Sequence, residues 1–259
     1  MIGIIGLGFV GGAMLKSFKL KNINVVGYDK YNESDPFENV LKADIIFLCL
    51  PTLFDEVTDT YNKDAIHEVC KKLEAYNGIV VIKSTIEPET TNNLSKLYNL
   101  RFVHNPEFLT ARTAFEDFHN QKHIVLGKGP NCDDLTLISN FYSEYYPDAS
   151  ISICDSLESE SMKIYCNSFY ASKVMLFNEY YMLSQKNGSN FNTIKDLMLK
   201  NNWINEMHTT VPGPDGKFGY GGACFPKDTK ALNSYMKKLE TPNNVLEAVI
   251  KQCENIRNQ

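Results

Sequence analysis

The sequence lacks the features that mark several classes of protein. No apolar run reaches the roughly 18–20 residues that a membrane-spanning helix needs. The chain opens on an apolar stretch without the basic segment of a secretion signal, and internal repeats are missing. The 26 Lys and Arg residues against 31 Asp and Glu residues leave a net charge of -5. We therefore expect neither a membrane protein nor a binder of duplex nucleic acid, which would carry a basic surface.

Cysteine pairs with a metal-binding or redox spacing are also missing. The seven Cys residues are an odd number and include no C-x-x-C pair, and the five His residues form no cluster of metal ligands. We therefore expect thiols rather than disulfides, a reducing, cytoplasmic location and no bound metal. The remaining composition, with 43% hydrophobic and 22% charged residues over 259 positions, is that of a soluble globular protein with room for two domains.

Short apolar runs alternate with helical patterns in the first half of the chain. Such alternation predicts a parallel sheet whose strands are joined by crossover helices. The expected strands are Ile2–Ile5, Asn24–Tyr28, Ala43–Leu50, Ile79–Lys83, Arg101–Val103 and His123–Leu126, and the expected helices are Val10–Leu20, Asp64–Tyr76, Glu89–Tyr98 and Asp133–Glu144.

The second half of the chain changes to helical patterns from about Asp155 on. The segment Met207–Gly222 is rich in Gly and Pro and is expected to be an irregular loop. The expected helices are Ser156–Lys186, Thr193–Asn201, Lys227–Lys238 and Val245–Arg257.

A G-x-G-x-x-G pattern, Gly6–Gly11, lies between the first expected strand and the first expected helix. In dinucleotide-binding folds the first glycine permits a tight turn, the second lets the backbone approach a pyrophosphate, and the third lets helix and strand pack closely. Asp29 ends the second strand, 23 residues after Gly6, where an acid binds ribose hydroxyls and repels a 2′-phosphate. The pattern predicts NAD rather than NADP, although Lys30 weakens that preference. A glycine turn in an unrelated α/β fold is the alternative.

Two later strand ends are expected to border the same crevice, because ligands of parallel sheets bind at the carboxyl ends of the strands. They are Leu50–Thr52 and Lys83–Thr85, which could otherwise be ordinary polar loops. The fold class is thus α/β: a Rossmann-like, doubly wound, mainly parallel sheet over residues 1–152, followed by a smaller all-helical domain over residues 153–259, which is built on a long central helix. The predicted cofactor-binding residues are Gly6, Gly8, Phe9, Val10, Gly11, Asp29, Lys30, Pro51, Thr52 and Thr85.

The segment Phe218–Thr229 places a cysteine at the start of an expected helix. Pro226 suits the first turn of a helix, where its missing N–H costs nothing, so Cys224 would lie just before that helix. The helix N-terminus and the nearby Lys227 both favour the thiolate form of Cys224. The glycines before Cys224 let the backbone approach a ligand. The alternative, a small buried hydrophobic residue, fits the other six cysteines better.

The segment Gly219–Thr229 resembles the active-site segment of the UDP-glucose/GDP-mannose dehydrogenase family, which acts on nucleotide sugars. Three further segments resemble that family as well, so the similarity extends from residue 1 to about residue 250. They are Lys83–Ile86, Asn105–Leu109, and the helical region with Glu158–Lys163, Asn167 and Asn178-Glu179.

The resemblance implies oxidation of the C6 alcohol of a nucleotide sugar, most simply UDP-glucose, to a carboxylate with two NAD and one water. Cys224 is the implied nucleophile, and the substrate carbon bound to its sulfur is first a thiohemiacetal and then a thioester. Lys163 and Asn167, four apart on one helix face, would stabilise the oxygen on C6. The implied acid–base residues are Glu107 and Asp228, with Thr85 helping Asp228 to hold a water. The implied substrate-binding residues are Phe108, Leu109, Lys163, Asn167, His208, Phe218, Gly219, Tyr220 and Gly221.

The chain departs from the family pattern in three places. Ala111 stands where the family often has a second acid, the loop Val211–Lys217 looks longer than the common form, and a third α/β domain that closes over the nucleotide is not expected within 259 residues. The long helix is apolar on several sides, so we expect a homodimer through it. Two alternatives are a β-hydroxyacid dehydrogenase, which makes one hydride transfer and needs no cysteine, and an NAD-binding relative without turnover.

Overall fold

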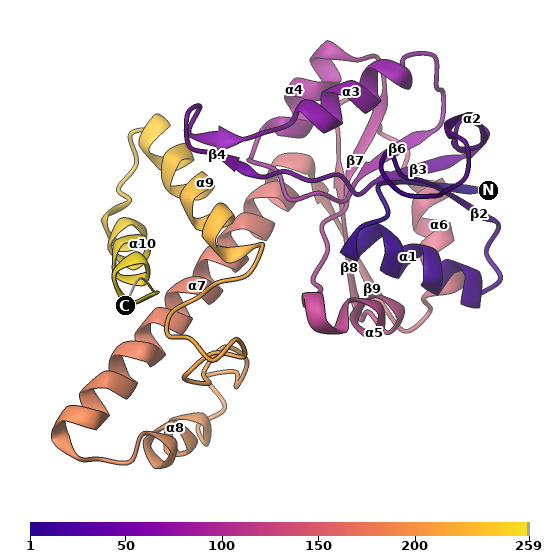
Figure 1. Cartoon of the computed structure of the whole chain (residues 1–259). Helices are drawn as coiled ribbons and strands as arrows, with labels where there is room; N and C mark the ends of the chain where they lie inside the picture. The colour runs from indigo at the N-terminus through magenta and orange to yellow at the C-terminus, as the bar shows by residue number, and fades with distance from the viewer. Residues whose placement is uncertain (258–259) are drawn as a thin grey trace. The chain divides into compact units, whose positions relative to one another are not determined.

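The computed structural model describes residues 1–257 of the chain (Figure 1). They form two compact units. Unit 1 consists of residues 1–53 and 61–163, and unit 2 consists of residues 54–60 and the chain from residue 164 on. The division falls inside one long helix, and the domain boundary expected after residue 152 stays a prediction.

Unit 1 is built on a seven-stranded sheet in the order β2-β1-β3-β6-β7-β8-β9. β7 and β8 pair antiparallel, whereas the other neighbouring strands pair parallel, which confirms the predicted mainly parallel sheet. The strand order changes direction at β1 and β3, and the carboxyl ends of such strands are where open α/β sheets bind ligands. The strands are β1 (Ile2–Ile5), β2 (Val25–Tyr28), β3 (Ile45–Leu48), β6 (Ile79–Ile82), β7 (Arg101–His104), β8 (His123–Lys128) and β9 (Ser150–Asp155).

Helices cover both faces of this sheet. Successive residues of a strand point to opposite faces, so an uninterrupted apolar strand needs a covering layer on each side. In β3, Ile45 and Phe47 belong to the core on one face, and Ile46 and Leu48 belong to the core on the other. Figure 1 shows α3 and α4 on one side of the sheet and α1 and α6 on the other. The sheet is therefore doubly wound, as predicted. The first core includes α1 (Phe9–Leu20), α5 (Ala114–His119) and α6 (Thr136–Tyr145), and the second includes α2 (Phe37–Val40), α3 (Asp64–Lys72) and α4 (Thr90–Leu97).

Several short elements are missing from the sequence-based prediction. The edge strand β9 alternates isoleucine with serine or cysteine and is largely exposed, so its period-two pattern carries little hydrophobic signal. The helices α2 and α5 have only 4 and 6 residues, too few to show a helical period. The remaining short elements are the 3-10 helix η1 (Ala111–Thr113) and the hairpin strands β4 (Phe54–Asp55) and β5 (Thr60–Tyr61).

Unit 2 is mainly helical and contains most of α7 (Ser156–Asn187), a helix of 32 residues. Its core packs Ala171 and Met175 of α7 against Tyr220 and Cys253. Residues 207–222 contain no helix or strand, as expected for an irregular loop. Although α7 is long, neither it nor another helix in residues 1–257 has an apolar stretch sufficient to cross a membrane. The other helices are α8 (Phe191–Leu199), α9 (Phe225–Lys238) and α10 (Asn244–Arg257).

Candidate functional site

The first glycine loop, Gly6–Gly11, joins β1 to α1, and two of its glycines are required by the packing of the chain itself. Gly6 has a φ of +90°, and a Cβ there would lie 2.4 Å from the carbonyl oxygen of Cys49. A Cβ on Gly11 would lie 1.9 Å from the carbonyl oxygen of Gly6. Because both obstacles are backbone atoms, only glycine fits these two positions.

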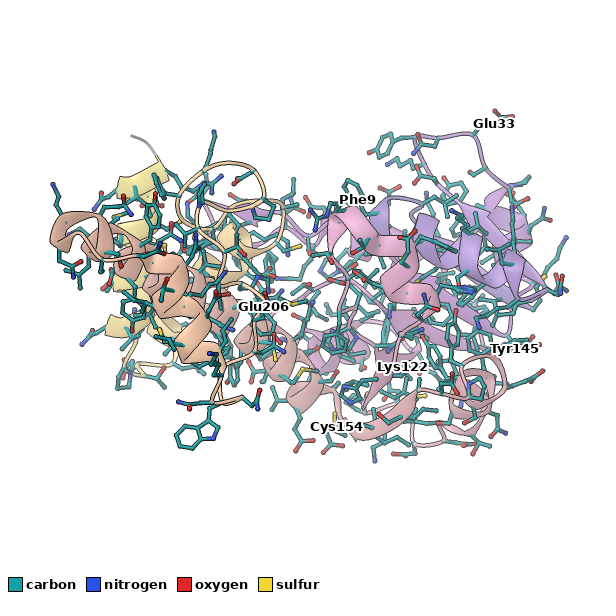
Figure 2. All side chains as sticks on the ribbon, turned by 90° about the horizontal axis from the view of Figure 1, so that it is seen from below. Phe9, Glu33, Lys122, Tyr145, Cys154 and Glu206 are labelled. Carbon is teal, nitrogen blue, oxygen red and sulfur yellow. The ribbon has the colours of Figure 1, made fainter. Side chains whose placement is uncertain are left out.

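Gly8 differs from its two neighbours, because a Cβ there would meet no atom within 4 Å. It is the N-cap residue of α1, whose first turn carries no acidic side chain. Phe9, labelled in Figure 2, is the first residue of that helix. The protein therefore leaves bare backbone in front of a helix N-terminus, where an anion is favoured. This arrangement fits the pyrophosphate of a dinucleotide, although no packing requires glycine at this position.

Asp29 follows β2 and is hydrogen-bonded to the first glycine loop. Its Oδ2 accepts a bond from the backbone N of Leu7 at 2.7 Å, and its Oδ1 accepts bonds from the backbone N atoms of Tyr31 and Asn32. Burial alone would raise the pKa of Asp29, but these hydrogen bonds outweigh it and lower the pKa below its ordinary value. Asp29 therefore stays ionised, as a carboxylate that accepts ribose hydroxyls must be. Lys30 is paired with the carboxylate of Glu68 at 2.8 Å.

The loops after β3 and β6 are bonded to each other, so the structure brings together the two strand ends that were expected to border one crevice. The Ser84 hydroxyl donates to the carbonyl of Leu50 at 2.7 Å, and the Thr52 hydroxyl donates to the carbonyl of Thr85 at 2.7 Å. Thr52 and Thr85 are buried, whereas Pro51 is exposed. The cofactor roles assigned to these residues stay predictions.

Glu107 and Lys163 form a buried ion pair within unit 1. The Lys163 Nζ lies 3.1 Å from the Glu107 Oε1 and also donates to the backbone carbonyl of Glu107. The other carboxylate oxygen of Glu107 accepts a bond from the backbone N of Leu109, and the Phe108 ring lies 5.4 Å from the Lys163 Nζ. The Asn-Pro-Glu-Phe-Leu segment thus folds around a buried lysine of α7.

Lys83 is a buried residue directly after β6, at a strand end that was expected to border the cofactor crevice. Its Nζ donates to the Asn105 Oδ1 at 3.1 Å and to the carbonyl of Pro106 at 3.4 Å. Burial lowers the pKa of Lys83 to about 8 and that of His104 to about 3. The signal in the sequence was a lysine directly after the four apolar residues of β6, since a lysine at the end of a buried strand needs polar partners.

In unit 2, Cys224 is the N-cap residue of α9, and a proline follows within the first two helical positions. Cys224 is exposed, whereas the other six cysteines are buried or partly buried. Asp228, in the first turn of the same helix, is fully buried. Its Oδ1 lies 2.6 Å from the Lys227 Nζ, and its Oδ2 accepts a bond from the Asn167 amide at 2.6 Å. The structure thus joins two of the implied catalytic residues, Asn167 and Asp228. Cys224 lies one turn before Asp228, at the start of the same helix.

The second glycine loop, Gly213–Gly222, holds several implied substrate contacts whose roles stay predictions. Tyr220 is buried in the core of unit 2, and its hydroxyl lies 3.3 Å from the Thr229 hydroxyl. His208, which precedes the loop, lies against the rings of Tyr170 and Phe225. Burial, and then the charge of Lys173, lower the pKa of His208.

Within residues 1–257, His, Cys, Asp and Glu side chains form no group of three or more that could hold a metal ion.

The fold and the first glycine loop define a dinucleotide-binding α/β protein. Residues 31–145 match the NAD binding domain, and residues 157–255 the central domain, of the UDP-glucose/GDP-mannose dehydrogenase family. The chain belongs to this family, and the match to its NAD binding domain confirms the predicted cofactor.

A UDP-glucose 6-dehydrogenase of Rickettsia typhi is 30% identical over 251 residues, which are 92% of this chain and 53% of that relative. The chain therefore spans about half the length of the curated relatives that it matches. A UDP-glucose dehydrogenase structure from Pyrobaculum islandicum superimposes with a TM-score of 0.84 at 22% identity, covering 98% of this chain and 68% of that one. A 3-hydroxyisobutyrate dehydrogenase from Mycobacterium tuberculosis gives a TM-score of 0.75 at 17% identity, covering 96% and 91%. At these identities both structures show a shared fold alone.

Proposed function

We propose that this protein oxidises the C6 alcohol of a nucleotide sugar to the carboxylate with NAD, and that UDP-glucose is its substrate. The observation that carries the proposal is the exposed thiol of Cys224 at the N-terminus of α9, one turn before the buried Asp228. A helix N-terminus stabilises a thiolate. A dehydrogenase that makes a single hydride transfer has no use for such a nucleophile.

The chemistry removes four electrons from one carbon in two steps. Bound NAD supplies the acceptor for each hydride. Between the two steps, the Cys224 thiolate adds to the aldehyde carbon and the carbonyl oxygen takes up a proton, which gives a thiohemiacetal. After the second oxidation a thioester remains, and water attacks its carbonyl. The C–S bond then breaks, the thiolate is regenerated and the carboxylate leaves.

The surrounding residues are assigned to charge stabilisation and proton transfer. Lys163 and Asn167, four positions apart on α7, would stabilise the negative charge that develops on the C6 oxygen. Glu107 and Asp228 share the acid–base work, and Thr85 helps Asp228 to hold the water. The hydrogen bond from Asn167 to Asp228 supports a joint role for these two residues. The substrate contacts of Phe108, Leu109 and the second glycine loop belong to the same proposal.

We further propose a homodimer that pairs through α7. Tyr165, Phe169, Leu176, Tyr180 and Leu183 are all exposed, and their spacings of four, seven, four and three place them on one face of the helix. An exposed apolar stripe of this length on a soluble protein marks an interface. Sedimentation analysis should show a dimer that Leu176→Glu dissociates, and a parent protein that sediments as a monomer contradicts this pairing.

A reducing compartment such as the cytoplasm suits an exposed nucleophilic thiol.

The stoichiometry of NADH formation tests the main proposal. Purified protein, UDP-glucose and NAD should yield two NADH for each UDP-glucuronate, and Cys224→Ala should abolish acid formation while leaving NAD binding intact. Cys154→Ala is the matched control, because Cys154 is a partly exposed thiol in β9 of unit 1 (Figure 2). One NADH from a small hydroxyacid, unaffected by Cys224→Ala, overturns the proposal in favour of a β-hydroxyacid dehydrogenase. NAD binding without NADH from any sugar nucleotide favours a non-catalytic relative.

A further inference from the structure

Arg257, in the last turn of α10, connects three residues of the second glycine loop. Its Nη2 donates to the Asp215 carboxylate at 2.6 Å, and its Nη1 donates to the carbonyl oxygens of Phe218 and Gly219 at 3.2 Å each. A Cβ on Gly221 would lie 2.5 Å from the same Nη2. Glycine at position 221 therefore makes room for the guanidinium, independently of any ligand.

Two other side chains hold the same stretch of backbone. The Cys253 thiol, one turn before Arg257 on α10, donates to the carbonyl of Tyr220 at 3.3 Å. From α7, the Asn178 side chain accepts a bond from the backbone N of Gly219 at 3.0 Å. The loop itself contributes a turn, in which the N of Gly213 donates to the carbonyl of Lys217. A segment without helix or strand thus has its path set by side chains from two helices.

We infer that Arg257 is a positioning residue for Cys224. Arg257 fixes the backbone of Phe218–Gly221, so that the Cys224 thiol, three residues after Gly221, has one defined position. A guanidinium can do this because its donors form a rigid planar fork that reaches two carbonyls and a carboxylate at once. A lysine ammonium at the end of a flexible chain cannot reproduce that geometry. The inference rests on the proposed function in that Cys224 is taken as the nucleophile.

The first test measures the loop directly and requires no turnover. Trypsin cleaves after Lys217, which is exposed in the loop, and iodoacetamide alkylates the Cys224 thiol. Arg257→Ala should speed cleavage at Lys217 and change the rate of Cys224 alkylation, each by about tenfold as expected for lost charge-assisted hydrogen bonds. Arg257→Lys should behave like Arg257→Ala, and Asp215→Asn should give a smaller change. Lys251→Ala, an exposed basic residue on the same helix, is the matched control and should match the parent.

The second test uses the steady-state kinetics of UDP-glucose oxidation. Arg257→Ala should lower kcat by about tenfold or more, because the nucleophile is misplaced, while the Kd for NAD, which binds to unit 1, stays unchanged. Full activity in Arg257→Ala together with parental rates of cleavage and alkylation overturns the inference. If the parent produces no NADH but the variants still change cleavage and alkylation, the positioning role stands and the proposed function falls. If Arg257→Ala does not fold, the cleavage rate, the alkylation rate and the kcat of Asp215→Asn test the inference instead.

Discussion

The two glycine loops use the same residue for different physical reasons. In the first loop, Gly6 and Gly11 are required by nearby backbone, and Gly8 faces open space at a helix N-terminus. In the second loop, Gly221 makes room for the side chain of Arg257, and Gly222 has a φ of +77°. Glycine spacing alone therefore does not distinguish a ligand cradle from a place where a helix crosses a loop. The surroundings of each absent Cβ make that distinction.

Among the substitutions that test this comparison, Gly11→Ala should cause the largest loss of stability. The obstacle to its Cβ is the carbonyl oxygen of Gly6, which cannot move without opening the turn. We expect a loss of about 3 kcal/mol or more in the free energy of unfolding, measured by urea denaturation. A stable Gly11→Ala protein with parental NAD affinity contradicts the packing argument.

Gly8→Ala should separate stability from cofactor binding. The added methyl meets no protein atom, so the melting temperature should stay within about 2 °C of the parent. The methyl would instead stand where backbone approaches a pyrophosphate, and the Kd for NAD should rise about tenfold. Titration calorimetry measures the Kd for NAD, and thermal denaturation measures the melting temperature. Unchanged NAD affinity would place the pyrophosphate elsewhere.

Gly221→Ala should have a smaller effect than Gly11→Ala, because the obstacle is the movable end of an arginine side chain. We expect a loss of about 1 kcal/mol in stability together with faster trypsin cleavage at Lys217, as Arg257 is displaced from the loop. Cleavage at the parental rate would show that the guanidinium has another way to hold these carbonyls.

The two acids that contact the loops should give the smallest effects. The hydrogen bond to Arg257 lowers the pKa of Asp215, and the pKa of Asp29 is lowered although burial opposes it. An acid with a lowered folded-state pKa stabilises the fold above its ordinary pKa of 3.8, and this contribution is lost as the pH falls through the folded value. Asp29→Asn and Asp215→Asn should each cost less than about 1 kcal/mol at pH 7 and nothing in strong acid. A loss that persists in acid points to a role other than charge.

The sequence predicted much of the fold because its signals are local. The apolar strands β1, β3 and β6 stand out as short, continuous hydrophobic runs, and their burial on both faces follows from helices on both sides. β9 was not predicted, because it is an edge strand that buries little apolar surface. The helix α9 was expected from Lys227, and it begins two residues earlier with Pro226 in its first turn. Helix ends depend on capping geometry that periodicity does not describe.

The candidate site was predictable only where a motif is local. The first glycine loop with Asp29, and Cys224 before a helix, each lie within one strand-to-helix connection, and the structure gives them the expected positions. The hydrogen bonds of Lys83 and Arg257 were not predicted, because their partners lie 22 and 38 to 42 residues away along the chain. Hydrogen bonds over such separations leave no periodic trace in a sequence.

By itself, the sequence determined the alternation of elements, the two glycine loops, the cysteine at the head of a helix and the family resemblance. These depend on residue type, spacing and backbone conformation over a few positions. Only the tertiary structure decided which glycines are required by packing, which carboxylates are bonded to which lysines, and why Gly221 lies opposite Arg257. Those properties come from distances between side chains that folding alone brings together.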